Sequence, residues 1–206
     1  MQNPIHQSIN DCIQAVAQLQ EDRNVEFIER AALLIADCFR AGNKIIIAGN
    51  GGSLCDAAHF AEELTGQFRH YRRALPAIAL SEPGHLTCVG NDMGFDKVFA
   101  RGVEAYGQPG DVFIGLTTSG NSKNIITAIE RAKELGLATV AFLGKDGGAL
   151  KGVADLEMLI SGFTFSDRIQ EAHMAAIHII IELVEQHLFA SEQIEQQCEC
   201  SAIEQS

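Results

Sequence analysis

Hydrophobic positions along this chain follow two patterns that replace each other at intervals. Short apolar runs rich in β-branched residues predict buried parallel strands, and longer segments with apolar residues every three or four positions predict amphipathic helices. The predicted strands lie at residues 44–48, 76–80, 112–116, 138–143 and 156–160. The predicted helices cover residues 5–22, 25–40, 53–64, 95–106, 122–135 and 166–188, and a short helical segment opens at Pro83-Gly84.

Strands that alternate with helices predict a three-layer α/β/α sandwich around a mostly parallel sheet of about five strands, with right-handed crossovers. The 206 residues, 47% of them hydrophobic, suffice for one well-buried domain. We predict a single domain over residues 1–190, including the leading helices, and a polar C-terminal tail over residues 191–206. Because the first helix precedes every predicted strand, we expect its apolar stripe to pack on another helix, of the same subunit or of a partner.

A glycine-rich turn follows the first predicted strand and runs directly into a helix. It reads Gly49-Asn50-Gly51-Gly52-Ser53, with Ser53 at the expected N-cap. Free N–H groups and the positive end of the helix dipole suit an anion such as a sugar phosphate. The turn has neither the G-x-G-x-x-G order of a dinucleotide fold nor the Gly-Lys-Ser/Thr ending of a P-loop. Taken alone, it is equally well a tight strand-to-helix connection.

A second polar loop follows the third predicted strand. The segment Thr117-Thr118-Ser119-Gly120-Asn121-Ser122 places several hydroxyls and a glycine at a strand-to-helix turn. One such loop is common as a Ser/Thr-rich N-cap, but two of them at neighbouring strand ends favour phosphate binding. The carboxyl ends of parallel strands share one rim, so we expect both loops, together with Gly90-Asn91-Asp92, at the same edge of the sheet.

Two helices carry polar side chains suited to metal binding or acid–base chemistry. His59 and Glu63 are four residues apart and share a helix face. Gln170 and His178 are eight apart on the last predicted helix, and His178 lies in an apolar run where an imidazole must be paired or ligated. These four side chains either form one mixed nitrogen and oxygen site or are structural residues, with a backbone carbonyl satisfying His178. His173 lies on another face and is predicted to be structural.

The charge balance and the cysteines narrow the function classes. The chain has 15 Lys and Arg against 27 Asp and Glu, a formal net charge of −12, which disfavours nucleic acid and anionic membranes as partners. The N-terminal residues do not resemble a signal peptide and no segment is long and apolar enough to span a bilayer. We therefore expect a cytoplasmic protein with reduced, mostly buried cysteines. Cys198 and Cys200 form a C-x-C pair that could bind a soft metal, but a loose polar tail explains it better.

These motifs together resemble the sugar isomerase (SIS) domain family and, within it, the bacterial phosphoheptose isomerases. The resemblance extends from the leading helix to about Leu188. It rests on Gly49-Asn50-Gly51-Gly52-Ser53 with Asp56, His59 and Glu63; on Val89-Gly90-Asn91-Asp92; on Thr118-Ser119-Gly120-Asn121-Ser122; on Gly144-Lys145-Asp146-Gly147-Gly148; and on Asp167-Arg168-Ile169-Gln170-Glu171 followed by His178.

The resemblance implies a role for each matching residue. It implies that Glu63 and His178 are the catalytic acid/base pair. It also implies one zinc ion per subunit, with four ligands, which are His59, Glu63, Gln170 and His178. The implied substrate site is lined by Asn50, Gly51, Gly52, Ser53, Glu63, Asn91, Asp92, Thr117, Thr118, Ser119, Ser122, Asp167 and Gln170. Gln67 stands where these isomerases carry arginine, so a basic contact from this segment would have to come from Arg69 or Arg72.

The activity that the resemblance implies is isomerisation of sedoheptulose 7-phosphate to D-glycero-D-manno-heptose 7-phosphate through an enediol, the first step of heptose synthesis for the lipopolysaccharide core. The implied assembly is a homotetramer with active sites between subunits. One alternative is a non-catalytic SIS-domain protein that binds a sugar phosphate or a replication initiator, which would be expected to lack the four predicted metal ligands. Another is an enzyme for a different phosphosugar, such as an N-acetylated hexose phosphate, which would lack the run at 167–171.

Overall fold

A single parallel sheet forms the middle layer of the computed structural model, which describes the backbone of residues 3–203 and the side chains of residues 3–190. Its strands pair in the order β2-β1-β3-β4-β5, so the chain enters the sheet one strand from its edge, adds β2 on one side and then adds β3 to β5 on the other. The strands are β1 (Ile45–Gly49), β2 (Ala77–Ala79), β3 (Val112–Thr117), β4 (Ala138–Gly144) and β5 (Leu156–Ile160).

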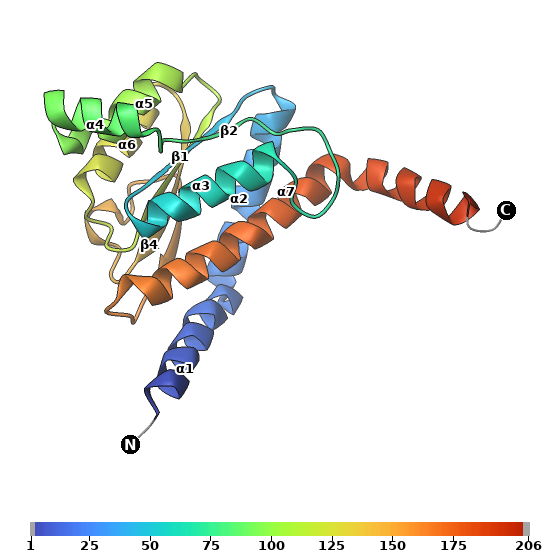
Figure 1. The fold of residues 1–206 in the computed structure, drawn as a ribbon, viewed down its shortest axis with the longest axis horizontal. Coiled ribbons are helices and arrows are strands. Elements are labelled where there is room, and N and C mark those ends of the chain that lie inside the picture. The colour runs from blue at the N-terminus through green and yellow to red at the C-terminus, as the bar shows by residue number, and fades with distance from the viewer. Residues whose placement is uncertain (1–2, 204–206) are drawn as a thin grey trace.

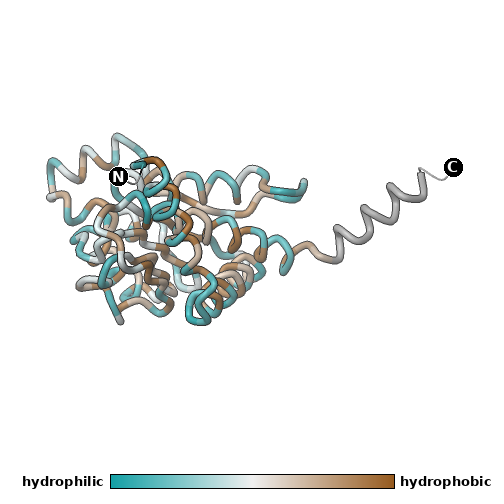
Figure 2. The backbone as a smooth tube through the Cα atoms, turned by 90° about the horizontal axis from the view of Figure 1, so that it is seen from below, coloured by the Kyte–Doolittle hydropathy of each residue, from teal (hydrophilic) through white to brown (hydrophobic). Residues whose placement is uncertain are grey.

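Helices cover both faces of this sheet (Figure 1), which confirms the predicted three-layer sandwich. The α-helices are α1 (Pro4–Ala17), α2 (Asp22–Arg40), α3 (Gly52–Thr65), α4 (Pro83–Asp92), α5 (Val98–Tyr106), α6 (Lys123–Glu134) and α7 (Ser166–Ile203), and short 3-10 helices are η1 (Gln18–Gln20), η2 (Phe95–Lys97) and η3 (Gly148–Leu150). Hydrophilic and hydrophobic residues alternate along most helices (Figure 2), as expected of helices with one buried side.

The core divides into two apolar clusters, one on each face of the sheet. Ile45 and Ile47 pack in the cluster that includes α2, α3 and α7, whereas Ile46 and Ala48 pack in the cluster that includes α5 and α6. Successive side chains of a strand point to opposite faces, and a strand buried on both faces must therefore be apolar at every position. This is why β1 appears in the sequence as an uninterrupted apolar run.

Three helix ends differ from those predicted. Gly51, with φ at +55°, is the N-cap of α3, so Ser53 lies inside the first turn and not at the cap. Helix α4 extends to Asp92, so Gly90-Asn91-Asp92 forms its last turn and not a loop. Helix α7 continues past Leu188 to Ile203.

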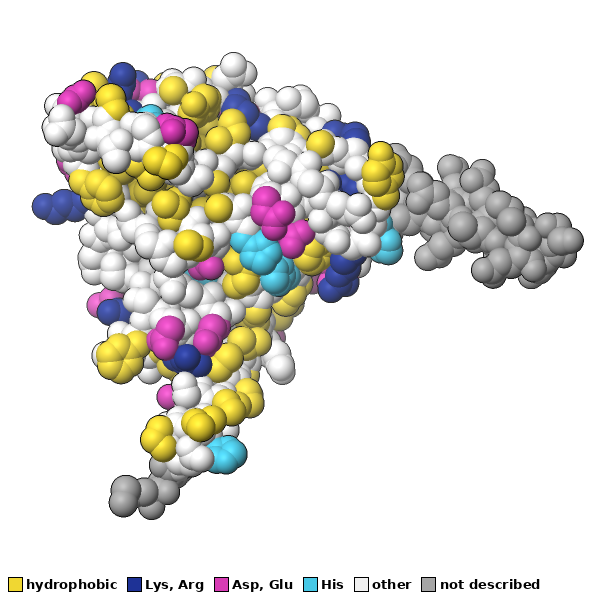
Figure 3. Space-filling model, in the orientation of Figure 1, with side chains coloured by type: hydrophobic (Ala, Val, Ile, Leu, Met, Phe, Trp, Pro, Cys, Tyr) yellow, Lys and Arg dark blue, Asp and Glu magenta, His cyan; other side chains and the backbone are white. Residues whose placement is uncertain are grey.

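Helix α1 packs along α7 but leaves part of its apolar stripe uncovered. Leu19, just beyond α1, is buried, whereas Ile5, Ile9 and Ile13 are 66%, 50% and 60% exposed. Figure 3 shows hydrophobic side chains in a row along this helix. The stripe therefore packs in the same chain only at its C-terminal end.

The cysteines differ from expectation. Among the described side chains Cys38 is buried, Cys12 is half-buried, and Cys55 and Cys88 are exposed on the outer sides of α3 and α4; all four are free thiols. The prediction of buried cysteines is therefore confirmed for Cys38 and wrong for Cys55 and Cys88. Cys198 and Cys200 lie outside the residues whose side chains are described. In the described part of the chain, every helix is too short or too polar to cross a membrane.

Candidate active site

The two polar loops predicted to bind phosphate meet at the carboxyl ends of β1 and β3, and a cavity of about 130 Å³ lies between them. Its lining is formed by Asn50, Ser53, Leu116, Thr117, Thr118, Ser122, Ser166 and Gln170. Hydroxyls dominate this lining, and in the described part of the chain the backbone N–H group of Ser122 has no acceptor. Ser119, which was predicted to line the site, is not part of this lining. The cavity therefore offers the donors that a phosphate needs without a lysine.

Side-chain hydrogen bonds order this cavity. Thr117 Oγ1 and Ser122 Oγ are 3.0 Å apart, and Thr118 Oγ1 donates to Ser166 Oγ at 2.9 Å. Ser166 is the first residue of α7, so the start of that helix contributes to the site. The sequence analysis missed Ser166, although a serine at a helix start could have signalled it.

A reciprocal pair of amides joins the two loops. Asn50 Nδ2 donates to Asn124 Oδ1 at 3.0 Å, and Asn124 Nδ2 donates to Asn50 Oδ1 at 2.8 Å. Asn124 lies in the first turn of α6 and is buried. The sequence analysis did not select Asn124, because an asparagine in the first turn of a helix is common and its partner is 74 residues away.

A third loop supports the hydroxyl loop from behind. A Cβ placed on Gly120 would lie 1.8 Å from the carbonyl oxygen of Gly147, so the two loops approach too closely for any residue but glycine. Ala149 N donates to Asn121 Oδ1 at 3.0 Å, and Leu150 N donates to the Gly120 carbonyl at 3.1 Å. The loop after β4 thus fixes the shape of the cavity between the two loops without lining it; this cavity is called the phosphate cavity below, after its predicted ligand.

His59, Glu63 and His178 come together between α3 and α7, as the sequence predicted. His59 Nε2 lies 3.1 Å from Glu63 Oε1, and the rings of His59 and His178 are 5.1 Å apart, edge to face. One ligand atom from each residue can be chosen so that all three lie within 4.8 Å of one another. All three side chains are half-buried, and Figure 3 shows histidine and acidic side chains side by side on this face. Two imidazoles and one carboxylate are a donor set that zinc accepts.

The surroundings of this cluster alter two titrations. Burial lowers the pKa of His178, and the neighbouring His59 lowers it further, so this imidazole is neutral at pH 7 and able to bind a metal or exchange a proton. Burial raises the pKa of Asp56 to about 6, and its Oδ2 atom has no hydrogen-bond partner.

Gln170, the fourth predicted metal ligand, lies apart from the three-residue cluster in the structure. Its amide nitrogen donates to Ser53 Oγ at 3.2 Å, and its side chain covers Gly52. Eight residues of an α-helix span about 12 Å, which separates Gln170 from His178 along α7. Within one chain Gln170 therefore belongs to the phosphate cavity, and its role as a metal ligand stays a prediction.

The remaining predicted substrate residues lie around the rim. Asn91 Nδ2 donates to Asp92 Oδ1 at 2.7 Å in the exposed last turn of α4, and Asp167 pairs with Arg168 near the start of α7. A second hollow of about 520 Å³ adjoins the phosphate cavity through Asn50 and Ser122, and its wall also contains Gly51, Phe95, Asp96, Lys123 and Asn124. The roles of Asn91, Asp92 and Asp167 in binding the sugar stay predictions.

Two arginines could provide the basic contact that Gln67 lacks, but one of them is buried and already paired within the chain. Arg72 is buried, and its Nε donates to Glu185 Oε1 at 2.9 Å. Arg69 is half-exposed, pairs with Glu182 and lies over the ring of Phe68. Arg72 is thereby excluded as a direct substrate contact.

His173 is structural, as predicted. It is fully buried, its Nε2 lies 3.0 Å from the carbonyl oxygen of Leu143, and its ring packs edge-on against Phe142. Burial lowers its pKa to about 4, and the hydrogen bond to Leu143 opposes this shift only in part.

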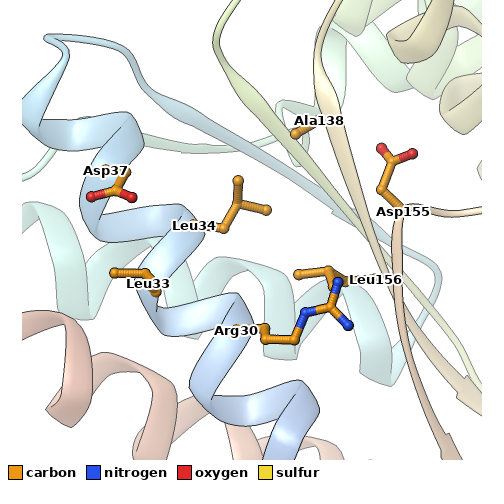
Figure 4. A pocket seen from close by; sticks show the side chains of 7 residues that line it. All are labelled: Arg30, Leu33, Leu34, Asp37, Ala138, Asp155 and Leu156. Atoms are coloured by element: carbon orange, nitrogen blue, oxygen red, sulfur yellow. The ribbon is translucent and has the colours of Figure 1, made fainter.

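A further hollow of about 360 Å³ lies at the opposite end of the sheet (Figure 4). Leu34 of α2 points toward Ala138 and Leu156, the first residues of β4 and β5, and Arg30, Leu33, Asp37 and Asp155 complete the lining. Ligands of parallel α/β sheets bind at the carboxyl ends of the strands, where the phosphate cavity lies. This hollow is therefore not the active site.

Comparison with known proteins identifies relatives over nearly the whole chain. The sequence model of the SIS domain family matches residues 7–144. The phosphoheptose isomerase of Fusobacterium nucleatum is 56% identical over 178 residues, which cover 86% of this chain and 91% of that protein. The phosphoheptose isomerase of Escherichia coli is 50% identical over 188 residues, or 91% of this chain and 98% of that protein.

Comparison with solved structures indicates the same relationship. The structure of the phosphoheptose isomerase from Neisseria gonorrhoeae superimposes with a TM-score of 0.83 at 36% identity, covering 89% of this chain and 97% of that one. The hydroxyl-lined cavity and the His59–Glu63–His178 cluster thus lie in a chain that shares its fold and about half of its sequence with phosphoheptose isomerases. The chain belongs to the SIS domain family and, within it, to the phosphoheptose isomerases.

Proposed function

We propose that the protein interconverts sedoheptulose 7-phosphate and D-glycero-D-manno-heptose 7-phosphate, and so provides heptose for the lipopolysaccharide core. The observation that carries this proposal is the half-buried cluster of His59, Glu63 and His178 on the fold whose phosphate cavity is lined by hydroxyls. An aldose–ketose isomerase needs a phosphate anchor and a proton-transferring pair, and a sugar-phosphate sensor needs only the anchor. The cluster therefore favours the enzyme.

The reaction moves one proton between neighbouring carbons. We assign Glu63 as the base that removes the proton from C1 of the ketose, while His178 gives a proton to the carbonyl oxygen at C2, which leaves an enediol. Glu63 then returns the same proton to C2 while the C1 hydroxyl gives its proton to His178, so the aldehyde forms and both residues regain their starting state. Acid–base catalysis of this kind contributes roughly 10²- to 10⁴-fold. Because the lowered pKa keeps His178 neutral, it donates as a neutral imidazole.

His59, Glu63 and His178 fit a zinc ion in number and kind of donor atoms, and we propose that they hold one. A bound zinc ion would supply Lewis-acid polarisation of the sugar oxygens. Gln170 of the same chain is tied to Ser53, so a fourth ligand from Gln170 would come from a second copy of the protein.

The length of α3 supports an active site shared between copies. Ser53 at the phosphate cavity and Glu63 are ten residues apart on this helix, a distance of about 15 Å. A seven-carbon chain with C–C bonds of about 1.5 Å extends roughly 10 Å to its phosphorus atom. A sugar anchored in the cavity of one chain thus spans less than the rise between Ser53 and Glu63, and we propose that Glu63 and His178 serve the cavity of a neighbour.

The proposed assembly is a homotetramer in the cytoplasm. The exposed stripe of Ile5, Ile9 and Ile13 on α1 supports association, because apolar side chains spaced by one helical turn gain most from burial against another helix. A shared active site makes the assembly necessary for activity.

The proposal is tested by incubating the purified protein with sedoheptulose 7-phosphate, with and without a chelator, and following the aldoheptose phosphate. We expect conversion that the chelator abolishes and zinc restores. Conversion that is unaffected by the chelator would contradict the proposed zinc site but not the proposed isomerase. The absence of conversion under any metal condition would contradict the enzyme and favour a sugar-phosphate-binding protein.

A further inference from the structure

Arg72 has a buried guanidinium whose hydrogen bonds end on two helices. Its side chain is 2% exposed, and that of its partner Glu185 on α7 is 3% exposed. Nη2 donates to the carbonyl oxygen of Glu63 at 2.7 Å, and Nη1 donates to that of Leu64 at 2.9 Å and of Gly66 at 3.0 Å. One buried cation therefore binds the last turn of α3 and the middle of α7 at the same time.

The carbonyl groups at the C-terminal end of an α-helix have no partner within the helix, and they carry the negative end of its dipole. A guanidinium meets both requirements, because it has five N–H donors in a rigid plane and a permanent positive charge. Arg72 thus donates the hydrogen bonds that a further turn of α3 would have given to these carbonyl groups, and it holds the C-terminal end of that helix in place. Glu63, one of the residues whose carbonyl it holds, also carries a side chain of the active site.

On α7 the partner lies in register with the active site. Glu185 follows His178 by seven residues, which is close to two helical turns, so both side chains point toward α3. The Arg72–Glu185 pair and the contact of His59 with His178 are then two successive connections between the same two helices. The first is buried, and the second is half-buried.

We infer that Arg72 and Glu185 are positioning residues for the isomerase site: their buried ion pair sets the distance between α3 and α7, and thereby the distance of His59 and Glu63 from His178. This inference rests on the proposed function for its kinetic part and on the three-residue cluster for its metal part. Ligands of a metal must be held to a fraction of an ångström, and loss of a supporting contact typically lowers metal affinity about 10- to 100-fold.

The variants are Glu185→Gln, which keeps the shape and one hydrogen bond, Arg72→Lys, which keeps the charge, and Arg72→Met, which keeps neither. Asp111→Asn is the matched control. Asp111 is buried and pairs with Lys44 at 2.6 Å at the amino ends of β1 and β3. The hydrogen-bond partners of its carboxylate are Lys44 and Gln108, which belong to neither α3 nor α7, so its loss destabilises the fold without removing a contact between these two helices. Each protein is measured below its own unfolding temperature.

Two readouts separate positioning from general stability. Zn²⁺ affinity of the metal-free protein is measured by competition with a chromophoric chelator, and kcat and KM are measured with sedoheptulose 7-phosphate. We expect Glu185→Gln and Arg72→Met to weaken Zn²⁺ binding about 10- to 100-fold and to lower kcat more than they raise KM, because the phosphate cavity is at the other end of α3. Arg72→Lys should recover part of both losses, and Asp111→Asn should lower only the unfolding temperature.

Zn²⁺ affinity and kcat within twofold of the wild type in folded Glu185→Gln and Arg72→Lys would overturn the inference and leave the pair a structural brace. Equal losses in Asp111→Asn would overturn it too. If the wild type binds Zn²⁺ but does not convert the sugar, the proposed function fails and the affinity series still tests the positioning. If Arg72→Met does not fold, Glu185→Gln and Arg72→Lys carry the test.

Discussion

Gln170 Nε2 donates to Ser53 Oγ at 3.2 Å, and this bond ties the beginning of α7 to the beginning of α3 at the phosphate cavity. The arrangement depends on Gly52. A Cβ at that position would lie 2.7 Å from both polar atoms of the Gln170 amide, so any larger residue displaces this side chain.

Gly52→Ala is therefore expected to raise KM for the sugar phosphate several-fold with little loss of stability, because the group that must move is the free end of a flexible side chain. The control is Gln170→Ala, alone and combined with Gly52→Ala. Once Gln170 is absent, the alanine at 52 should cost nothing further. Additive effects of the two substitutions on KM would contradict this explanation.

Glu63→Gln is expected to lower kcat by at least about 100-fold, because an amide cannot remove a carbon-bound proton. Circular dichroism and the unfolding temperature should stay close to those of the wild type, since Glu63 is partly exposed and the amide keeps its volume. Substantial remaining isomerisation, with the protein folded, would contradict the assignment of Glu63 as the base.

An active site shared between copies predicts complementation. Glu63→Gln damages the catalytic side of a site, and the double variant Thr118→Ala, Ser119→Ala damages the phosphate side. Each protein alone should be nearly inactive. After mixing, unfolding and refolding together, roughly a quarter of the sites should combine two intact halves, so activity should return to about that fraction. No recovery in mixed oligomers verified by mass spectrometry would place both halves in one chain.

His173 predicts a loss of stability in acid. Its pKa is lowered to about 4 in the fold, from an ordinary value near 6.5 in the unfolded chain. The folded protein thus binds this proton less readily, so the contribution of His173 is complete above pH 6.5 and is lost as the pH falls toward 4. At that limit the loss is about 3 kcal/mol.

Urea unfolding at pH 7.5, 5.5 and 4.5, at one protein concentration, measures this loss. His173→Gln keeps a donor for the Leu143 carbonyl and cannot be protonated, so its stability should depend less on pH in this range. Equal slopes for both proteins would show that other groups cause the acid sensitivity.

Much of the fold could be predicted from the sequence, because buried parallel strands and amphipathic helices have distinct apolar periods. The three-residue cluster could be predicted as well, since His59 and Glu63 are one helical turn apart and His178 lies in an apolar run that demands a partner. Asn124 and the buried position of Arg72 could not. Their partners are 74 and 113 residues away, and no local pattern encodes a contact of that separation.

Gln170 illustrates a different limit. Its spacing from His178 correctly places both on one side of α7, yet a shared side is not a shared site when the two are about 12 Å apart. A position along the helix axis matters as much as a position around it. The N-cap of α3 was misplaced for a local reason: the positive φ of Gly51 allowed the helix to begin earlier than serine preference suggests.

The paired amides of Asn50 and Asn124 also bear on how long the protein survives chemically. Asn50 precedes Gly51, a sequence in which the backbone nitrogen of the glycine readily attacks the asparagine side chain and converts it to aspartate. Here that side chain accepts one hydrogen bond and donates another, and the two bonds restrict the rotation of its amide group. Peptide mass mapping of aged samples should find deamidation at position 50 faster in Asn124→Ala than in the wild type. The hydrogen bonds between Asn50 and Asn124 thus slow deamidation in the lining of the phosphate cavity, where a new carboxylate would repel a phosphate.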